Sequence, residues 1–232
     1  MKVTTDACLF GAWAAARYQH PGIDEHSKMP LRKKMLDIGT GTGLLSLMMT
    51  QRHPGLETLS IEIDPETAAE ARKNISGSPW PDHIRVICAD ALHYEYEGTF
   101  DLIISNPPFY AKDLKGPDPK KNLAHHQEGL MLPDLLSLIG RLLSPSGQFF
   151  LLLPFRRLDE IRELAARYQL ALIHITQVRA RTGQQPIRVL LQGQAAGAEP
   201  VHCIQDELDI QVAEGAYSPA IIELLKEYYL YL

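Results

Sequence analysis

The sequence predicts an α/β fold with a doubly wound, mostly parallel sheet, in a single domain that spans residues 1–232. Short apolar runs of strand length alternate with longer segments of helical periodicity, which is the pattern of successive strand-helix units. The first of these units passes from strand to helix through a glycine-rich turn. With 232 residues, 45% of them hydrophobic, the chain is long enough to bury one sizeable core without a second domain.

The first half of the chain predicts a helix followed by strand-helix units. Asp6 to Arg17 has helical character, and a loop rich in polar residues and prolines follows it. A short apolar strand at 35–38 then enters the glycine turn, and the next helix runs on through Leu47 and Met48. Three further apolar runs predict strands at 59–64, 84–88 and 100–104.

The second half begins with a long loop, residues 110–132, which has few apolar repeats and many turn formers. A loop of this length in a compact domain tends to be functional, so we expect it to gate the substrate. The remaining elements are predicted as helices at 135–143 and 161–168 and strands at 148–154, 171–178 and 187–192. The last two strands flank a polar turn and predict an antiparallel hairpin, and residues 193–200 are the only candidate linker.

Composition argues against several classes of protein. A net charge of −5 and a pI near 6.0 do not indicate a protein that binds nucleic acid through a general positive field. No apolar run approaches the roughly 20 residues that span a membrane and no secretory signal opens the chain, so we expect a cytoplasmic protein without membrane contact. The three cysteines lie far apart, and His125-His126 has no Cys or spaced acid nearby, so neither disulfides nor a metal site are expected.

The glycine-rich turn, which contains Gly39, Gly41 and Gly43, predicts a ligand site at the end of the first strand. Glycine lets the backbone approach a ligand closely and adopt positive φ. A dinucleotide fingerprint needs its third glycine one residue later, where this chain has Leu44. The spacing, with Asp37 two residues before the first glycine, instead resembles the motif of S-adenosylmethionine-dependent methyltransferases. That resemblance implies that Asp37 faces the amino-acid end of the cofactor.

Acids follow the next two strands. Glu62 ends the second strand about 20 residues beyond the glycines, where a ribose hydroxyl pair needs an acceptor, and we assign it that role. Asp64 precedes Pro65 at a helix start and is expected to be an N-cap. Asp90 follows the third strand and either accepts from the cofactor adenine amine or caps the local turn. The order of the elements favours the first role.

The run Ser105-Asn106-Pro107-Pro108-Phe109 follows the fourth strand and is predicted to be the reactive centre. The exocyclic amine of adenine is a poor nucleophile because its lone pair is delocalised into the ring. The side-chain oxygen of Asn106 and the carbonyl of Pro107 can each accept one N–H and localise that lone pair. The prolines stiffen the loop, and a base stacked on Phe109 gains about 1–3 kcal/mol. The alternative is an ordinary proline turn with Phe109 in the core.

In this order, the motifs resemble those of the Rossmann-like N6-adenine and amino-group methyltransferases. More narrowly, the chain resembles the bacterial valine-tRNA adenine-N6-methyltransferases, through further segments at 2–13, 186–191 and 217–230. The family usually has an aromatic and basic segment before the Met-Lys at which this chain begins. The resemblance implies a class I methyltransferase fold with a seven-stranded sheet that ends in an antiparallel hairpin. It also implies methyl transfer from S-adenosylmethionine to N6 of an adenine in tRNA, beside the anticodon of tRNA(Val).

The same resemblance implies a role for the N-terminal segment. Residues 1–30 are expected to form a helical segment that closes the cofactor site, to which Lys2 or Thr5 contributes. Tyr110 and Lys112, which follow Phe109, are expected to bind the substrate.

The net negative charge argues against a nucleic-acid substrate, but positive charge is concentrated in one stretch of the chain. Between Arg156 and Arg188 there are seven arginines and three acids, so this stretch carries +4. We expect three of these arginines to contact phosphates: Arg179, Arg181 and Arg188.

Other functions remain open at this point. The same chemistry on DNA adenine, ribosomal RNA or a protein glutamine fits the Asn-Pro-Pro-Phe run equally well. A non-catalytic, S-adenosylmethionine-binding factor associated with RNA is opposed by the intact Asp37 and Asn106. A nucleotide-dependent oxidoreductase is opposed by the glycine spacing. We expect the protein to be a monomer.

Overall fold

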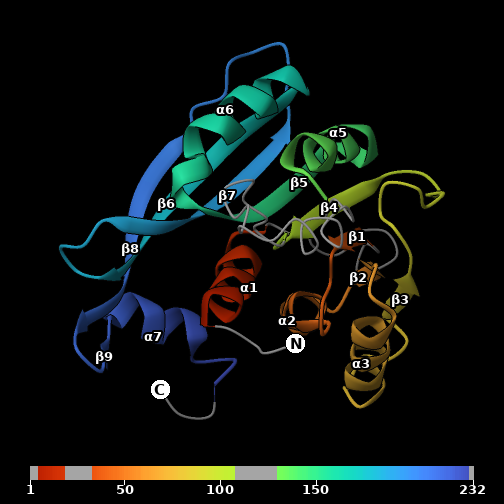
Figure 1. Ribbon diagram of the computed structural model, residues 1–232, viewed down its shortest axis with the longest axis horizontal. Helices are drawn as coiled ribbons and strands as arrows, with labels where there is room; N and C mark the ends of the chain where they lie inside the picture. Colours follow the sequence, from red (N-terminus) through yellow and green to blue (C-terminus); the bar gives the residue numbers. More distant parts are fainter. Residues whose placement is uncertain (1–4, 19–32, 108–129, 230–232) are drawn as a thin grey trace, which may run out of the picture.

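The computed structural model describes residues 5–18, 33–107 and 130–229. These residues form one mixed sheet with the strand order β3-β2-β1-β4-β5-β7-β6-β8-β9 (Figure 1). Five parallel strands make up one part of it: β1 (Lys33–Ile38), β2 (Leu56–Glu62), β3 (Ile84–Cys88), β4 (Phe100–Ser105) and β5 (Leu143–Pro154). The other part comprises β6 (Leu170–Arg181), β7 (Pro186–Ala195), β8 (Ile204–Ala213) and β9 (Ala216–Tyr217). The predicted hairpin is confirmed, since β6 and β7 pair antiparallel.

The expected number of seven strands is wrong, because nine are present among the described residues. β8 pairs parallel with β6, and the short β9 continues the sheet beyond β8. The sequence hides β8 because three acids, Asp206, Glu207 and Asp209, interrupt its apolar residues. Each acid is paired across the strands, Asp206 with the hydroxyl of Thr176 and the other two with Arg179, which makes so acidic a strand compatible with the sheet.

Helices cover both faces of the sheet (Figure 1). Trp13 of α1 belongs to a core cluster with residues of α2 and α7, whereas α5 and α6 pack into a second cluster on the other face. The two clusters use alternate residues of the same strands, as the strand period of two requires. The described helices are α1 (Thr5–Arg17), α2 (Leu44–Arg52), α3 (Pro65–Ser76), α5 (Leu132–Leu142), the 3-10 turn η1 (Phe155–Arg157), α6 (Leu158–Arg167) and α7 (Pro219–Leu225).

Two local predictions about helices are confirmed. α1 occupies the segment expected to be helical after Thr5. Asp64 caps α3, because its carboxylate accepts a hydrogen bond of 2.8 Å from the backbone N–H of Thr67 and Pro65 opens the helix.

Within the described ranges, no helix combines the length and apolar character needed to cross a bilayer.

The strand order reverses between β1 and β4, and this reversal fixes where a ligand can bind. Ile38 of β1 stands opposite Ile61 of β2 on one side and Ser105 of β4 on the other. From this pair of neighbours the connections lead away in opposite directions, which leaves a crevice beyond the carboxyl ends of the strands. The glycine turn directly follows β1 and Asn106 directly follows β4, so both lie at this crevice.

Candidate active site

The glycine turn after β1 has the conformation that its sequence predicts. The three glycines have φ values of 71°, 59° and 84° at Gly39, Gly41 and Gly43, all in the left-handed region. A Cβ added to Gly43 would lie 3.3 Å from Cδ1 of Ile75, so this glycine serves the packing of α2 against α3. A Cβ added to Gly39 would meet no atom of the described residues within 4 Å. Gly39 therefore leaves an open side from which a ligand can approach the backbone.

Asp37 lies at the centre of a buried hydroxyl network. Its side chain is fully buried, and its Oδ2 accepts hydrogen bonds of 2.6 Å from both Thr40 Oγ1 and Ser46 Oγ. Ser46 Oγ is in turn 2.8 Å from Ser60 Oγ. The second carboxylate oxygen, Oδ1, is buried and has no hydrogen-bond partner among the described residues. Burial raises the pKa of Asp37 to about 6, even though both hydroxyl bonds oppose the rise.

This orphaned oxygen fits the cationic end of an S-adenosylmethionine molecule. A buried acceptor without a donor is unfavourable, and an ammonium group placed against it would satisfy it and favour the ionised carboxyl. The side chain of Asp37 thus has the acceptor chemistry required for the role predicted for it.

Glu62 is held in position by the backbone. It is 7% exposed, and its Oε2 accepts from the N–H of Gly41 at 2.9 Å while Oε1 accepts from that of Asp64 at 3.0 Å. A carboxylate oxygen has a further acceptor site after one such bond, so both oxygens retain capacity for ligand hydroxyls. The geometry is compatible with the predicted ribose role, which stays a prediction.

Asp90 forms a local turn after β3. Its Oδ1 accepts from the N–H of Leu92 at 2.9 Å, and its Oδ2 lies 2.8 Å from Nδ1 of His93. The capping role that the sequence left open is therefore occupied. Because β2 and β3 pair with Glu62 opposite Cys88, Asp90 still lies at the same sheet edge as Glu62, and its adenine contact stays a prediction.

Ile63 is a candidate that the sequence reasoning missed. It follows Glu62 directly and is 66% exposed, although it is a large aliphatic residue. Its carbonyl faces the thiol of Cys88 on β3. An exposed apolar side chain between two acid-bearing strand ends suits the face of a cofactor base. The available signal was an isoleucine between two acids, directly after the strand.

Asn106 is brought beside the glycine turn by the end of β4. Ser105 Oγ donates a hydrogen bond of 2.7 Å to the carbonyl of Ile38, which locks β4 to β1 one residue before Asn106 and Gly39. Asn106 is half-buried, and Pro107 is buried. The structure therefore brings the predicted reactive centre and the predicted cofactor turn together. Four of the predicted site residues, together with Lys2, lie outside the described residues: Pro108, Phe109, Tyr110 and Lys112.

Three arginines, Arg179, Arg181 and Arg188, are called the edge arginines below. They lie at the same end of the sheet as Asn106, where the parallel strands have their carboxyl ends, and this end is the sheet edge meant throughout. Arg188 stands opposite Pro154 at the carboxyl end of β5, which is the neighbour of β4. At roughly 4.8 Å per strand, Arg188 is thus about 10 Å from the line of β4. Arg179 is paired with Glu207 and Asp209, the latter at 3.5 Å. Their contact with phosphates stays a prediction.

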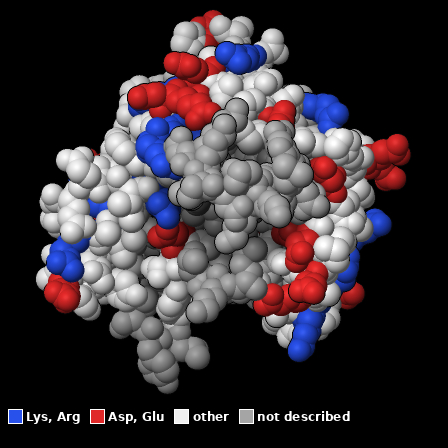
Figure 2. Space-filling view, in the orientation of Figure 1, with Lys and Arg blue, Asp and Glu red and all other residues white. Residues whose placement is uncertain are grey.

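Surface charge around this edge is mixed. On the face shown in Figure 2, basic and acidic side chains of the described residues are interspersed. The local excess of +4 counted along the sequence is therefore reduced in space by acids from elsewhere in the chain, such as those of β8. Phosphate binding at this edge would depend on individual guanidinium groups, since the general field is weak.

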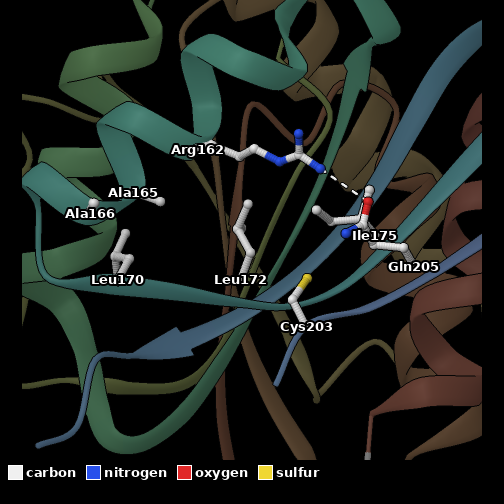
Figure 3. Close-up of a pocket in the computed structure, with 8 residues that line it drawn as sticks. All are labelled: Arg162, Ala165, Ala166, Leu170, Leu172, Ile175, Cys203 and Gln205. Atoms are coloured by element: carbon white, nitrogen blue, oxygen red, sulfur yellow. Dashed lines mark hydrogen bonds between the residues drawn. The ribbon is translucent and has the colours of Figure 1, made fainter. Parts of the chain in front are cut away.

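A separate cleft of about 440 Å³ lies under α6 (Figure 3). Arg162 donates a hydrogen bond to Gln205 there, and the thiol of Cys203 also lines the cleft. The strand residues that line it come from the beginnings of β6 and β8, at the edge opposite Asn106. The cleft is therefore not part of the candidate active site. Within the described ranges, no group of His, Cys, Asp or Glu is suited to hold a metal ion.

Comparison with known proteins gives matches over the whole chain. A family model described as "Methyltransferase small domain" matches residues 23–127. A protein named tRNA1(Val) (adenine(37)-N6)-methyltransferase from Phocaeicola vulgatus is 38% identical over 230 residues, which cover 99% of this chain and 91% of the relative. Relatives of the same name from Porphyromonas gingivalis and Aeromonas hydrophila are 39% and 38% identical. They cover 99% of this chain, and 89% and 91% of their own lengths.

Solved structures agree on the fold. A predicted O-methyltransferase from Agrobacterium tumefaciens superposes with a TM-score of 0.70 at 18% identity, over 98% of both chains. A glycopeptide N-methyltransferase, MtfA, complexed with S-adenosylmethionine gives a TM-score of 0.57 at 14% identity, over 84% of this chain and 100% of that one. The predicted Rossmann-like α/β fold is therefore confirmed.

Proposed function

The chain belongs to the family of tRNA1(Val) (adenine(37)-N6)-methyltransferases, and we propose that it methylates N6 of an adenine in tRNA, beside the anticodon of tRNA(Val). The observation that carries this proposal is the position of Asn106 and Pro107. They follow β4 directly beside the glycine turn of β1, at the point where the strand order reverses. The acceptor of the methyl group and its donor would therefore meet where the two halves of the sheet meet.

S-adenosylmethionine, when bound, supplies an electrophilic methyl group on its sulfonium. Asp37 would accept from its ammonium through Oδ1, Gly39 would lie open to its approach, and Glu62 would accept from its ribose hydroxyls. Asp90 and Ile63 would contact the adenine from the neighbouring strand ends. Thr5, the exposed first residue of α1, and Lys2 would help to close the site.

On the substrate side, Asn106 and Pro107 would activate the target amine. The Oδ1 atom of Asn106 and the carbonyl of Pro107 each accept one N–H of the adenine amine, which turns the lone pair toward the methyl group. The rigid backbone of Pro107 and Pro108 keeps these acceptors in place. A strong general base is then not required to make N6 nucleophilic.

The RNA would be held by stacking and by individual phosphate contacts. An unpaired anticodon-loop adenine is a suitable target because flipping it out costs only a few kcal/mol. Phe109 would stack on the flipped base, and Tyr110 and Lys112 would contact neighbouring groups. The edge arginines would bind phosphates two to three strands away from Asn106. We infer that the enzyme acts as a monomer in the cytoplasm, where its tRNA substrate is found.

The experiment that tests this function is transfer of labelled methyl from S-adenosylmethionine to total RNA, DNA and protein from a bacterial strain deleted for this gene. Label recovered as N6-methyladenosine in the tRNA fraction supports both the reaction and the substrate class. Label in DNA, ribosomal RNA or protein keeps the chemistry and refutes the tRNA assignment. Cofactor binding without any transfer would instead favour a non-catalytic RNA-associated role.

A further inference from the structure

Asp6 and Arg188 form an ion pair that joins two distant parts of the chain at the sheet edge that carries Asn106. Nε of Arg188 lies 2.9 Å from Oδ2 of Asp6, and the two side chains are 30% and 26% exposed. Asp6 belongs to the first turn of α1, where a carboxylate is already favoured by the helix dipole. The helix therefore does not need Arg188 to accommodate this acid.

The position of α1 makes the pair informative. At its other end, Arg17 contacts Asp206 and His174, near the beginnings of β6 and β8. α1 therefore crosses one face of the sheet, from the edge that carries the carboxyl end of β5 to the opposite edge. Asp6 thus lies in the end of α1 that reaches the substrate side of the sheet.

The pair also separates Arg188 from the other edge arginines. Val189 and Leu191 of β7 pack into the cluster beneath α5 and α6, so Arg188, which alternates with them, points to the face covered by α1. Arg179 instead pairs with Glu207 and Asp209, which alternate with the α1-facing Leu208 of β8. Each face of the edge thus has its own arginine with its own acidic partner.

We propose that Asp6 is a positioning residue that orients the guanidinium of Arg188 toward the phosphate backbone of the substrate RNA. This proposal rests on the proposed function. Nη1 of Arg188 also donates to the carbonyl of Ile187 at 3.1 Å, so both this bond and the ion pair with Asp6 restrain its guanidinium. A long side chain held in one geometry loses less conformational entropy when it binds a phosphate. Orientation by Asp6 therefore favours RNA binding, although its charge alone repels RNA.

These two effects have opposite signs, which makes the test sharp. If the carboxylate acted only through its charge, Asp6→Asn would bind RNA more tightly, because a repulsive group is removed. If Asp6 positions Arg188, the same substitution weakens RNA binding. Because the favourable effect of Asp6 passes through Arg188, Asp6→Asn should cause no further loss of RNA binding once Arg188 has been replaced by Gln.

The experiment measures kcat, the KM for tRNA and the affinity for S-adenosylmethionine, with tRNA purified from the strain deleted for this gene as the substrate. The full chain is compared with four variants: Asp6→Asn, Asp6→Glu, Arg188→Gln and the Asp6→Asn/Arg188→Gln double variant. We expect Asp6→Asn to raise KM for tRNA about three- to tenfold, with kcat and cofactor affinity changed less than twofold. Asp6→Glu should restore most of the loss, and the double variant should bind tRNA no more weakly than Arg188→Gln alone. Tighter tRNA binding by Asp6→Asn, or losses that add in the double variant, would overturn the proposal.

The matched control is Glu227→Gln, which removes the negative charge of another ion pair. Glu227 pairs with Arg52, the last residue of α2, at the end of that helix away from the glycine turn and Asn106. It should leave KM for tRNA unchanged, and an equal rise in this variant would overturn the assignment to Asp6. Absence of tRNA methylation by the unmodified enzyme would refute the proposed function itself, a result distinct from an active enzyme that is insensitive to Asp6→Asn.

Discussion

Asp37 should make the stability of the ligand-free protein depend on pH in a direction opposite to that of most acidic groups. Burial raises the pKa of Asp37 from its ordinary value of 3.8 to about 6 in the folded protein. Between these two values, the folded chain holds a proton that the unfolded chain has released. The stabilisation is therefore fully present below pH 3.8 and is lost as pH rises through about 6.

The magnitude follows from the shift. Two pKa units correspond to about 3 kcal/mol, because one unit is about 1.4 kcal/mol. Asp37→Asn cannot titrate and has nearly the same shape. The free energy of unfolding of the natural protein, minus that of Asp37→Asn, should therefore fall by up to about 3 kcal/mol between pH 4 and pH 8. Other titrating groups contribute to both proteins and cancel in this difference.

The assay is urea unfolding of both proteins at half-unit steps of pH, without ligand. Parallel curves for the two proteins would refute the reasoning, because they would show that the buried carboxyl does not titrate in this range. A second measurement tests the ligand side of the same argument. Affinity for S-adenosylmethionine should rise with pH from 5 to about 6 in the natural protein, as Asp37 ionises. Asp37→Asn should bind more weakly and show no such rise.

Three further outcomes are expected. Asn106→Ala should abolish turnover and change cofactor affinity by less than about twofold, as measured by single-turnover methylation and equilibrium dialysis; equal losses in both would contradict the assigned role. Gly43→Ala should lower the free energy of unfolding by about 1–3 kcal/mol, because φ is 84° and the new methyl meets Ile75 at 3.3 Å. The loss should exceed that of Gly98→Ala, where φ is 78° and, in the part of the chain that the structure describes, no atom lies within 4 Å of the added Cβ. Replacing all three edge arginines by Ala should weaken tRNA binding and flatten its dependence on salt in filter-binding titrations, and an unchanged slope would remove them from the interface.

Most of the cofactor half of the fold was predictable because its signals are local. A strand that runs into three alternating glycines needs left-handed backbone, and an acid before a helix-opening proline caps that helix. The exposure of Ile63, on which its proposed contact with the cofactor base rests, was not apparent, because an isoleucine after a strand is ordinary until its exposure is known. The orphaned Oδ1 of Asp37 was equally hidden, since only the packing shows which carboxylate oxygen the hydroxyls occupy.

The substrate half was less predictable because its signals are distant in sequence. Counting charges between Arg156 and Arg188 left out the acids of β8, which come later in the chain and pair with Arg179. The same count placed Arg179 and Arg188 in one group, although strand alternation and their partners assign them to opposite faces. Sequence composition therefore overstated the positive charge and did not show its direction.

The two halves also differ in whether the matched family model covers them. The matched methyltransferase model covers residues 23–127, which include the glycine turn, the acids of β2 and β3 and the Asn-Pro-Pro-Phe run. The edge arginines and their partners on β8 lie outside that range, and so does Asp6. Under the proposed function, methyl transfer to a planar amine would require only the first set, whereas the choice of RNA would require contacts beyond the base. We therefore expect that substitutions at the Asp6–Arg188 pair change which RNA is methylated and how tightly it binds, while substitutions at Asp37 or Asn106 change methylation of every substrate alike.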